Sequence, residues 1–494
     1  MPKKEESHKA MLVNLRHNWE QVAACLLILA AGIWRLALMD IFAGWEESDY
    51  GNLAMVRGVY ESTFLIYDMN HMPGYYGLAA LGLFLTEDTV LAAKMCSWLG
   101  GMLAYIAAVF WTRYWVGWKP ALLVAVLLFA QAEFSLYSAS ALREPIYAAA
   151  MMGVLWGASS RSPTFMVLSA VLAFSVRFEA PVALFPLLIL LYRRPRFIIA
   201  LGAGLSLAVL CWAFYCMKIH GTYQFWGHAT EVNVETGLGS EALSKVDWLK
   251  RGSAVSLHLL AWLLPWRIGW GVWLGAILSP FVLLNGEKGR QTFVLGAGLT
   301  LVWLGIGAVA QHEPGHNLYW KWLYPLVPFW IVLGVCFWWR WLQRFPNWLQ
   351  WSCWFLILGQ AVFSHVQESQ RQIERSQSLY APQVALAHWV EQQNNTNPLV
   401  FDNIPACWMN RKPNDFELIS WFDIPTDGTE QDFSNWLIDQ NVWGVLWFAE
   451  EWTQSPKVAP FLANGDQWCH QELCLQEHSR GDEYGWIFYL VEHH

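Results

Sequence analysis

The stretch VAACLLILAAGIWRLALMDIFAGWEESDY, from Val22 to Tyr50, joins a long apolar run to a cluster of acidic residues. The run from Val22 to Phe42 is long enough to cross the hydrocarbon core of a membrane, and no small-residue cleavage site follows it. Four basic residues precede it among the first 20 residues. We therefore expect a retained signal-anchor helix whose N-terminal segment, residues 1–20, lies in the cytoplasm.

The composition is typical of a polytopic membrane protein and not of a soluble one. Of the 494 residues, 55% are hydrophobic, only 14% are charged, and 34 are Trp, which gathers at the ends of membrane helices. The net charge of −8 says little by itself, because the placement of charge matters more in a membrane protein. The chain has no long basic tract, which argues against a nucleic-acid partner.

Apolar runs of membrane-spanning length recur along most of the chain. We count about eleven of them, each of roughly 16–25 residues, as needed to cross the hydrocarbon core. Their centres lie near Leu29, Leu103, Leu127, Met152, Ala170, Pro186, Leu205, Gly275, Leu299, Ile331 and Phe355. The runs predict an all-α, polytopic membrane domain over residues 21–377.

The loops between these runs alternate in charge. One set is basic and reads WTRYWVGWK, SSRSP, YRRPRF, NGEKGR and WWRWLQRFPNW, whereas the other set contains the acids of WEESD, REP, RFE and HEPGH. Basic loops stay in the cytoplasm, so the N-terminus is expected inside and the C-terminal part outside. Together with the compact length, this favours a multi-pass protein of a bacterial inner (plasma) membrane.

The composition changes near Ser378. ALAHWVEQQNNTNPLVFDN has the pattern of a polar amphipathic helix followed by a short strand, and DFSNWLIDQNVWGVLWFAEEW repeats that order. YGWIFYLVE has the pattern of a last strand. We expect residues 378–494 to form a small extracytoplasmic α/β domain, with a poorly ordered tail as the alternative.

Most of the nine Cys lie in or beside the spans, where they are apolar fillers. Cys469 and Cys474 are five residues apart in the C-terminal region, with polar, turn-like residues between them. In an oxidising compartment this spacing suits a hairpin disulfide. The alternative is a zinc site that adds His470 and His478, although the spacing matches no standard zinc site.

By this topology, Glu46, Glu47 and Asp49 lie just outside the membrane after the first span. A helix over Glu47–Val59 would place Glu47 and Tyr50 on one stripe, with Glu46 at the positive end of the helix dipole. The simplest interpretation is an acidic cap on a surface helix. The next segment of the chain favours a chemical role.

Two motifs come after the first span in order, WEESDY at 45–50 and HMPGYY at 71–76. They resemble the GT-C glycosyltransferases, in particular the branch of protein O-mannosyltransferases and aminoarabinose-type lipid A transferases. In that family the first outer loop carries Asp-Glu-x-x-Tyr and then a Pro-Pro-Leu-Tyr-like segment that opens a juxtamembrane helix. Here Glu46 stands at the Asp position, and Met72-Pro73-Gly74-Tyr75 replaces the paired prolines. The outer loop that we assign to 44–87 holds both motifs.

Three further segments resemble parts of the same enzymes. SALREPIYAAAMM resembles the start of their fourth span, SVRFEAPVALFPLLILL their Arg-x-Glu break, and NLYWKWLYPLVPFWIVLG their Arg-Tyr-x-x-Pro-x-x-Pro stretch. In the last of these, Lys321-Trp322 stands in place of Arg-Tyr. The resemblance runs from Val22 to about Leu333. It implies a GT-C fold of about eleven transmembrane helices with a small C-terminal α/β domain.

The resemblance also implies an enzyme, an inverting hexosyl- or pentosyltransferase embedded in membrane lipids. It would take a sugar from a polyprenyl-phosphate donor and transfer it to a lipid, glycan or protein acceptor at the outer membrane face. A carboxylate would take the acceptor's proton or orient the nucleophile. Glu46 matches the family's Asp and is our first candidate, Glu47 would position the acceptor, and Asp49 is the rival.

Such a reaction needs cations on the lipid phosphate, where negative charge grows as the glycosidic bond breaks. The outer-side candidates for this role are Arg57, Arg143, Arg177 and Lys321. Each of the three arginines also has a nearby acid with which it would form a structural ion pair instead. Arg177 interrupts an apolar run, where charges face a cavity or each other.

Four residues within these motifs are candidates for substrate contact, namely Tyr50, His71, Tyr75 and Glu144. Lone histidines are usually satisfied polar residues, so we assign no metal ligands. Relatives differ in their use of metal, and a divalent metal is the one cofactor that the resemblance leaves open.

Two other functions fit a protein of this composition. A transporter or flippase of lipid-linked sugars predicts internal repeats and charges spread through the bilayer midplane, whereas this sequence shows no clear repeat and its acids gather at one face. A non-catalytic membrane scaffold whose outer domain binds a partner would not need the WEESDY motif.

Overall fold

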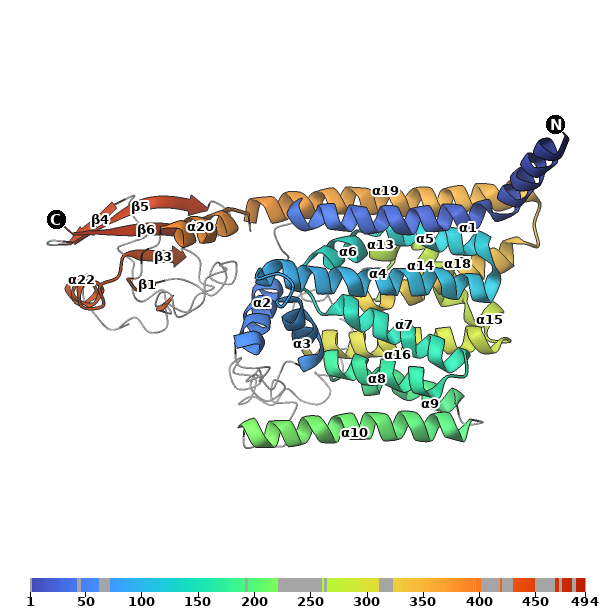
Figure 1. Cartoon of the computed structure of the whole chain (residues 1–494), viewed down its shortest axis with the longest axis horizontal. Coiled ribbons are helices and arrows are strands. Elements are labelled where there is room, and N and C mark those ends of the chain that lie inside the picture. Colours follow the sequence, from blue (N-terminus) through green and yellow to red (C-terminus); the bar gives the residue numbers. More distant parts are fainter. Residues whose placement is uncertain are drawn as a thin grey trace.

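The computed structural model describes residues 2–41, 46–61, 72–191, 194–220, 260–261, 264–310, 323–379, 381–393, 395, 397–400, 418–419, 430–448, 467–470, 473–481 and 486–493. A bundle of helices forms the larger part, and a sheet with two helices lies beyond one end of it (Figure 1). The helices of the bundle are α1 (Pro2–Ile41), α2 (Glu46–Glu61), α3 (Pro73–Gly82), α4 (Thr89–Val116), α5 (Trp118–Ala130), α6 (Ala132–Leu136), η1 (Tyr137–Ala139), α7 (Glu144–Ser159), α8 (Pro163–Val176), α9 (Ala180–Leu190), α10 (Pro195–His220), α13 (Leu264–Ile268), α14 (Trp270–Leu278), α15 (Pro280–Leu283), α16 (Glu287–Ala310), η3 (Tyr324–Leu326), α18 (Val327–Leu342) and α19 (Asn347–Leu379).

Every predicted span centre lies within one of these helices. Four stretches in the described part of the chain are long and apolar enough to cross a membrane by themselves: Trp19–Ile41, Thr89–Val116, Pro195–Lys218 and Tyr324–Leu342. A fifth span is formed if α5 and the helical segment Ala132–Ala139, bent by 75° relative to each other, count as one. The protein is thus a multi-pass membrane protein, and the number of about eleven spans stays a prediction.

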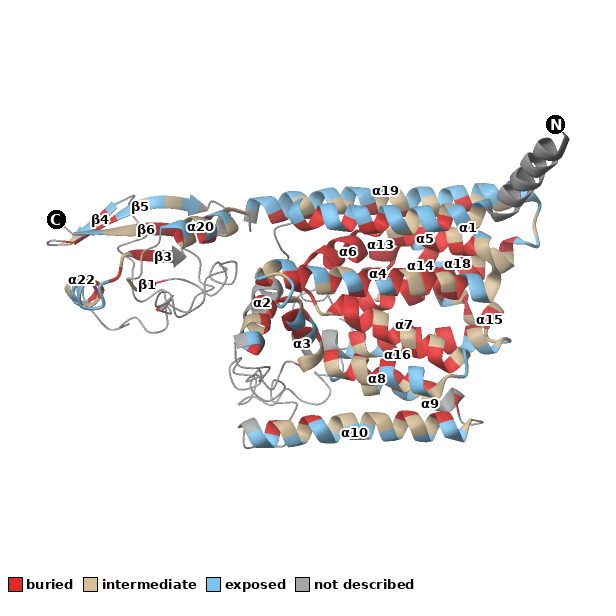
Figure 2. Ribbon diagram, viewed as in Figure 1, coloured by how far each residue is buried: buried red, intermediate tan, exposed pale blue. Residues whose placement is uncertain are grey.

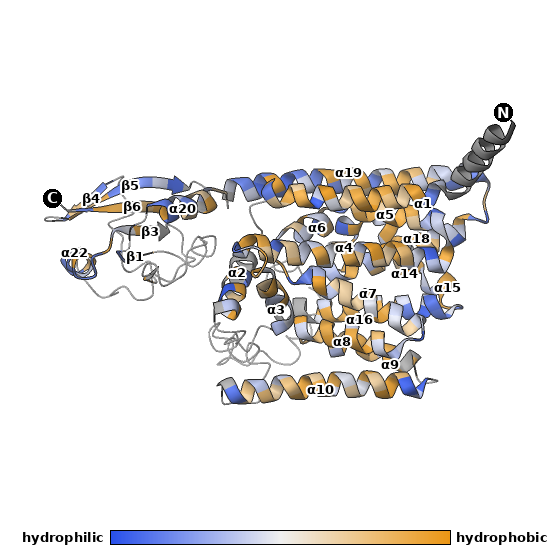
Figure 3. Ribbon diagram, viewed as in Figure 1, coloured by the Kyte–Doolittle hydropathy of each residue, from blue (hydrophilic) through white to orange (hydrophobic). Residues whose placement is uncertain are grey.

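Burial and hydropathy have the relation expected for a protein in lipid. The inner helices are the most buried (Figure 2), yet the exposed helix α10 is also largely apolar (Figure 3). On α10, Ile199, Leu207 and Phe214 are each more than 60% exposed. A soluble protein would carry polar side chains there, so lipid is the natural solvent of this surface.

Small residues allow the inner helices to approach closely. A Cβ atom on Gly100 of α4 would lie 2.6 Å from the backbone nitrogen of Ile146 in α7. A Cβ atom on Gly157 of α7 would lie 2.5 Å from the backbone nitrogen of Met166 in α8. Such contacts between backbones are the usual way in which membrane helices pack.

A proline and two N-cap residues mark where helices of the bundle begin, bend or break. Pro73 begins α3, as the sequence predicts, because its fixed φ suits the first turn of a helix. The chain bends after α5 at Gln131, whose side chain accepts a hydrogen bond from the backbone nitrogen of Phe134. The helix break at the predicted Arg-x-Glu motif separates α8 from α9, with Glu179 at the N-cap.

The C-terminal part contains α20 (Ala381–Gln392), β1 (Leu399–Val400), β2 (Leu418–Ile419), α22 (Glu430–Asp439), β3 (Gly444–Phe448), β4 (Gln467–His470), β5 (Leu473–Gly481) and β6 (Trp486–His493). The strands form one mixed sheet in the order β2-β1-β3-β6-β5-β4. β1 is parallel to β2 and β3, whereas the other neighbours are antiparallel. The two predicted helix–strand repeats and the predicted last strand are confirmed.

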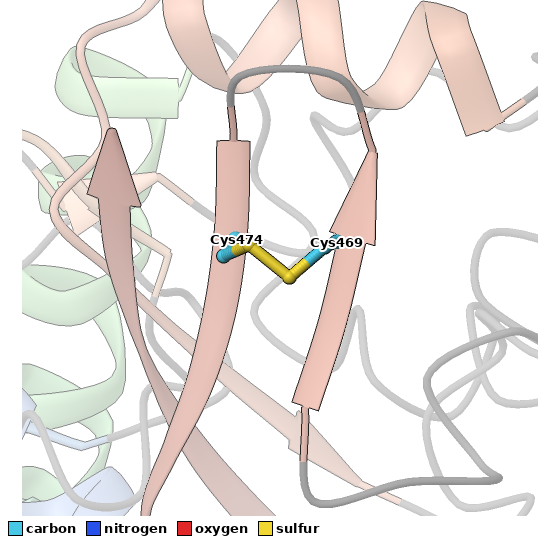
Figure 4. Close-up of a disulfide and its surroundings, with 2 residues drawn as sticks. All are labelled: Cys469 and Cys474. Atoms are coloured by element: carbon cyan, nitrogen blue, oxygen red, sulfur yellow. A yellow bond between two sulfur atoms is a disulfide. The ribbon is translucent and has the colours of Figure 1, made fainter. Parts of the chain in front are cut away.

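A disulfide joins Cys469 and Cys474 across the antiparallel strands β4 and β5 (Figure 4). The predicted hairpin disulfide is therefore confirmed. The zinc alternative is wrong, because the two sulfur atoms are bonded to each other. The Nε2 atom of His470 instead lies 2.9 Å from Oε1 of Gln431, and the ring centre of His478 lies 3.8 Å from that of Trp389.

The helices α2 and α3 and the N-terminus lie at opposite ends of the bundle. α2 and α3 lie at the end that faces the C-terminal sheet, whereas the N-terminus projects from the opposite end (Figure 1). The acidic motif and the sheet are therefore on the same side of the bundle. The loop-charge pattern predicts this arrangement, and it predicts that this side is extracytoplasmic.

Candidate functional site

The acidic motif forms the first turn of α2, which begins at Glu46. The predicted helix is confirmed. Glu46, Glu47, Asp49 and Tyr50 belong to α2 by their backbone, and their side chains lie outside the described part of the structure. α2 packs against α3 and α4. An acid in the first turn is favoured by the helix dipole, so the backbone alone agrees with both the cap and the chemical interpretation.

Arg177 lies at the centre of a buried ion-pair cluster. Its Nη1 atom lies 2.6 Å from Oε1 of Glu144, and its Nη2 atom lies 3.2 Å from Oε1 of Glu179. Glu144 is the first residue of α7, while Arg177 and Glu179 flank the break between α8 and α9. Arg143 is half-buried at the N-cap of α7, directly before Glu144. Three of the predicted site residues are thus brought together by this cluster, which we call the Arg177 cluster.

The Arg177 cluster has polar atoms that are buried and lack a hydrogen-bond partner within the described part of the chain. They are Oε2 of Glu144, Oε2 of Glu179 and the hydroxyl of Tyr147. Tyr147 lies one turn after Glu144 on the same face of α7. Buried polar groups in proteins are almost always paired, so these atoms have unused capacity for water or for the hydroxyl or amino groups of a ligand.

A second cluster, the Arg267 cluster, was not predicted. Nη1 of Arg267 on α13 lies 2.5 Å from Oε1 of Glu133 on α6 and 2.5 Å from Oε1 of Glu368 on α19. The amides of Gln131 and Gln372 donate to these two glutamates. The signal in the sequence is the lone charge inside an apolar stretch at Glu133 and at Arg267, since charges buried in membrane proteins pair with each other. Glu368 lies in a polar stretch beside Arg371 and gives no such signal.

Arg35 is the third buried arginine, and it lies within the opening apolar run. It is fully buried, and its guanidinium lies 5.1 Å from the ring centre of Tyr105 and 5.2 Å from that of Phe134. It donates to the carbonyl of Leu128 at 3.4 Å. Among the described residues, no carboxylate lies within ion-pairing distance of it. The aromatic faces offset part of the cost of burying its charge.

The remaining predicted site residues have different outcomes. Tyr75 is fully buried, with its hydroxyl 3.1 Å from both Ser97 Oγ and the carbonyl of Ala93. Arg57 is half-buried on α2. His71 and Lys321 lie outside the described residues. Within the described part of the chain, no group of three His, Cys, Asp or Glu side chains is placed to hold a metal ion.

The fold resembles solved structures of an ArnT from Cupriavidus metallidurans. The structure in the apo state gives a TM-score of 0.53 at 12% sequence identity, over 94% of this chain and 97% of that chain. The structure bound to undecaprenyl phosphate gives a TM-score of 0.58 at 10% identity, over the same shares of the two chains. The sequence matches no family model, and no curated protein is detectably similar to it. At such low identity the likeness concerns the fold, and this chain has the GT-C fold that the sequence motifs predict.

Proposed function

We propose that this protein is an inverting membrane glycosyltransferase that takes its sugar from a polyprenyl-phosphate donor. The acceptor would be a lipid, glycan or protein at the outer membrane face. The observation that carries the proposal is the fold, which is similar over 94% of the chain to that of an ArnT solved with undecaprenyl phosphate bound. The acidic turn of α2 adds support, because α2 lies at the end of the bundle that the loop charges assign to the outer face (Figure 1).

The chemistry needs one bond to form and one to break. The acceptor oxygen would attack the anomeric carbon, and the bond from that carbon to the phosphate oxygen would break with its electron pair passing to the phosphate. The acceptor's proton would pass to a carboxylate of the acidic turn, with Glu46 first, Glu47 as the group that positions the acceptor and Asp49 as the rival. A single displacement of this kind inverts the anomeric configuration.

The leaving phosphate gains negative charge as the bond breaks, so cations should face it. Arg57, Arg143 and Lys321 are the candidates that we retain for this role. Arg177 is already bonded to two glutamates, so its part would be to hold Glu144 and Glu179 in place. The open oxygens of those glutamates, with Tyr50 and His71 from the outer loop, would then accept hydrogen bonds from the sugar or the acceptor.

The test is transfer of labelled sugar from synthetic polyprenyl-phosphate sugars to acceptors in native membranes by the purified full chain. Wild type is compared with Glu46→Gln, Glu47→Gln and Asp49→Asn. Loss of a general base should lower kcat about 10²- to 10⁴-fold, and we expect this for Glu46→Gln. Glu374→Gln, at an exposed acid of α19, is the matched control and should keep wild-type activity.

Two outcomes would contradict the proposal. If wild type transfers no sugar from any donor of a panel that varies sugar and chain length, the assignment as a transferase fails. If all three acidic-turn variants remain folded and keep full activity, the acidic turn is only a helix cap, and the chemistry that we assign to it is wrong.

A further inference from the structure

A buried amide joins the acid-bearing helix α2 to its neighbours. Asn52 lies three residues after Asp49 and is 6% exposed. Its Nδ2 atom donates to the carbonyl of Ala141 at 2.7 Å, and its Oδ1 atom accepts from the hydroxyl of Tyr76 at 2.8 Å. The side chain therefore joins α2 to α3 and to the segment that leads into α7.

The segment that receives this bond is also fixed from its other side. Ser97 of α4 donates to the carbonyl of Leu142 at 2.6 Å, and its Oγ atom lies 3.0 Å from the backbone nitrogen of Leu142, which donates to it. Ala141 and Leu142 directly precede Arg143 and Glu144. The start of α7 thus has a set position relative to both α2 and α4.

Neither bond of Asn52 can be lost without cost. Tyr76 is fully buried, so displacing α2 would break both hydrogen bonds of the Asn52 amide away from water. Asn is suited to the place because one side chain must donate to a carbonyl and accept from a hydroxyl at the same time. Asp would lack the donor, and Leu would lack both groups.

We infer that Asn52 is a positioning residue for the transfer reaction, and this inference rests on the function proposed above. It sets the distance between the acidic turn of α2 and the Arg143–Glu144 end of the Arg177 cluster. Transfer requires the carboxylate to lie at a fixed distance from the groups that bind the donor, and a misplacement of about 1 Å can lower the rate about a hundredfold.

The experiment compares Asn52→Ala and Tyr76→Phe with wild type in the sugar-transfer assay. We expect kcat to fall about tenfold to a hundredfold with a smaller rise in the KM for the donor, because Arg57 and Tyr50 lie on α2 whereas the other proposed donor contacts do not. Tyr105→Phe is the matched control. Tyr105 is also fully buried, and its hydroxyl also donates to a backbone carbonyl at 2.8 Å, that of Ala125. It should lose comparable thermal stability and keep its kcat.

A second measurement is independent of activity. Hydrogen exchange of the full chain in detergent should be faster over residues 46–61 in Asn52→Ala and Tyr76→Phe, and unchanged there in Tyr105→Phe. Unchanged exchange over 46–61 in both Asn52→Ala and Tyr76→Phe would overturn the anchoring role. Wild-type kcat in both variants, or an effect on KM alone, would overturn the role in the reaction. A wild type that transfers no sugar would overturn the proposed function, and the exchange data would still test the anchor.

Discussion

Arg177 and Arg267 each hold two glutamates inside the helical bundle, but the two clusters differ in how the remaining carboxylate oxygens are satisfied. Around Arg267, a glutamine amide donates to each glutamate, and the amide oxygen of Gln372, not a carboxylate oxygen, is left without a partner in the described residues. Around Arg177, one oxygen of Glu144 and one of Glu179 are buried without a partner in the described part of the chain.

This difference separates a structural cluster from a candidate binding cluster. A buried ion pair whose buried carboxylate oxygens all have a partner holds helices together and leaves no open carboxylate oxygen for a ligand. A cluster with unused acceptors is incomplete until water or a ligand supplies donors. We therefore expect changes around Arg267 to affect stability most, and changes around Arg177 to affect substrate binding most.

The largest effect is expected for Arg267→Met. This change leaves the carboxylates of Glu133 and Glu368 buried without their cation, which should lower the free energy of unfolding by about 3–5 kcal/mol. Thermal unfolding in detergent measures it. Arg371→Met is the control, because Arg371 is exposed and lies 3.9 Å from Glu368, and no shift is expected. Equal melting temperatures for the two variants would show that the Arg267 cluster does not stabilise the fold.

An intermediate effect is expected from replacing one glutamate in each cluster. Glu133→Gln places an amide donor where both oxygens already accept bonds, at a cost of about 1–3 kcal/mol, with transfer kinetics unchanged. Glu144→Gln can turn its amide toward the open side and keep one oxygen on Arg177. Glu144→Gln should therefore lower the free energy of unfolding less than Glu133→Gln does, and it should raise the KM for donor or acceptor. Both quantities are measured on both variants, and a reversed pattern contradicts the comparison.

The smallest effect on stability is expected for Tyr147→Phe. Its hydroxyl has no partner in the described part of the protein, so its loss should change the free energy of unfolding by less than about 0.5 kcal/mol. The same change should raise the KM for donor or acceptor. Tyr324→Phe is the counterpart, since that hydroxyl lies 2.7 Å from Ser138 Oγ. It should cost about 1 kcal/mol. If Tyr147→Phe proves the more destabilising of the two, water or another part of the chain already completes the Arg177 cluster.

Local patterns allowed much of the fold to be predicted from the sequence. Apolar runs located the helices, loop charge predicted which ends share a side, and the spacing of Cys469 and Cys474 predicted their disulfide. Pro73 marked the start of α3 because proline favours the first turn of a helix. Each of these signals lies within a few residues of the feature that it predicts.

The partners within the site could not be predicted in the same way. The sequence left open whether Arg143 and Arg177 pair with the nearest acids or contact the donor phosphate. Arg177 pairs with Glu179 and also with Glu144, 33 residues away. The bonds of Arg267 reach 134 and 101 residues along the chain. Such pairs depend on how the helices pack, and one sequence does not encode that packing in any local pattern.

The length of α19 has a consequence for the membrane around the protein. Its 33 residues make a rod of about 50 Å, longer than the hydrocarbon core of about 30 Å, and its last 13 residues, from Gln367, are mostly polar. If α19 crosses the membrane, as the sequence predicts near Phe355, the hydrocarbon boundary would lie near Val366, two residues before Glu368. Because Glu368 is bonded to Arg267, the protein would then fix this depth. A thinner bilayer must deform around α19 or tilt it, and tilting would move the C-terminal sheet with it.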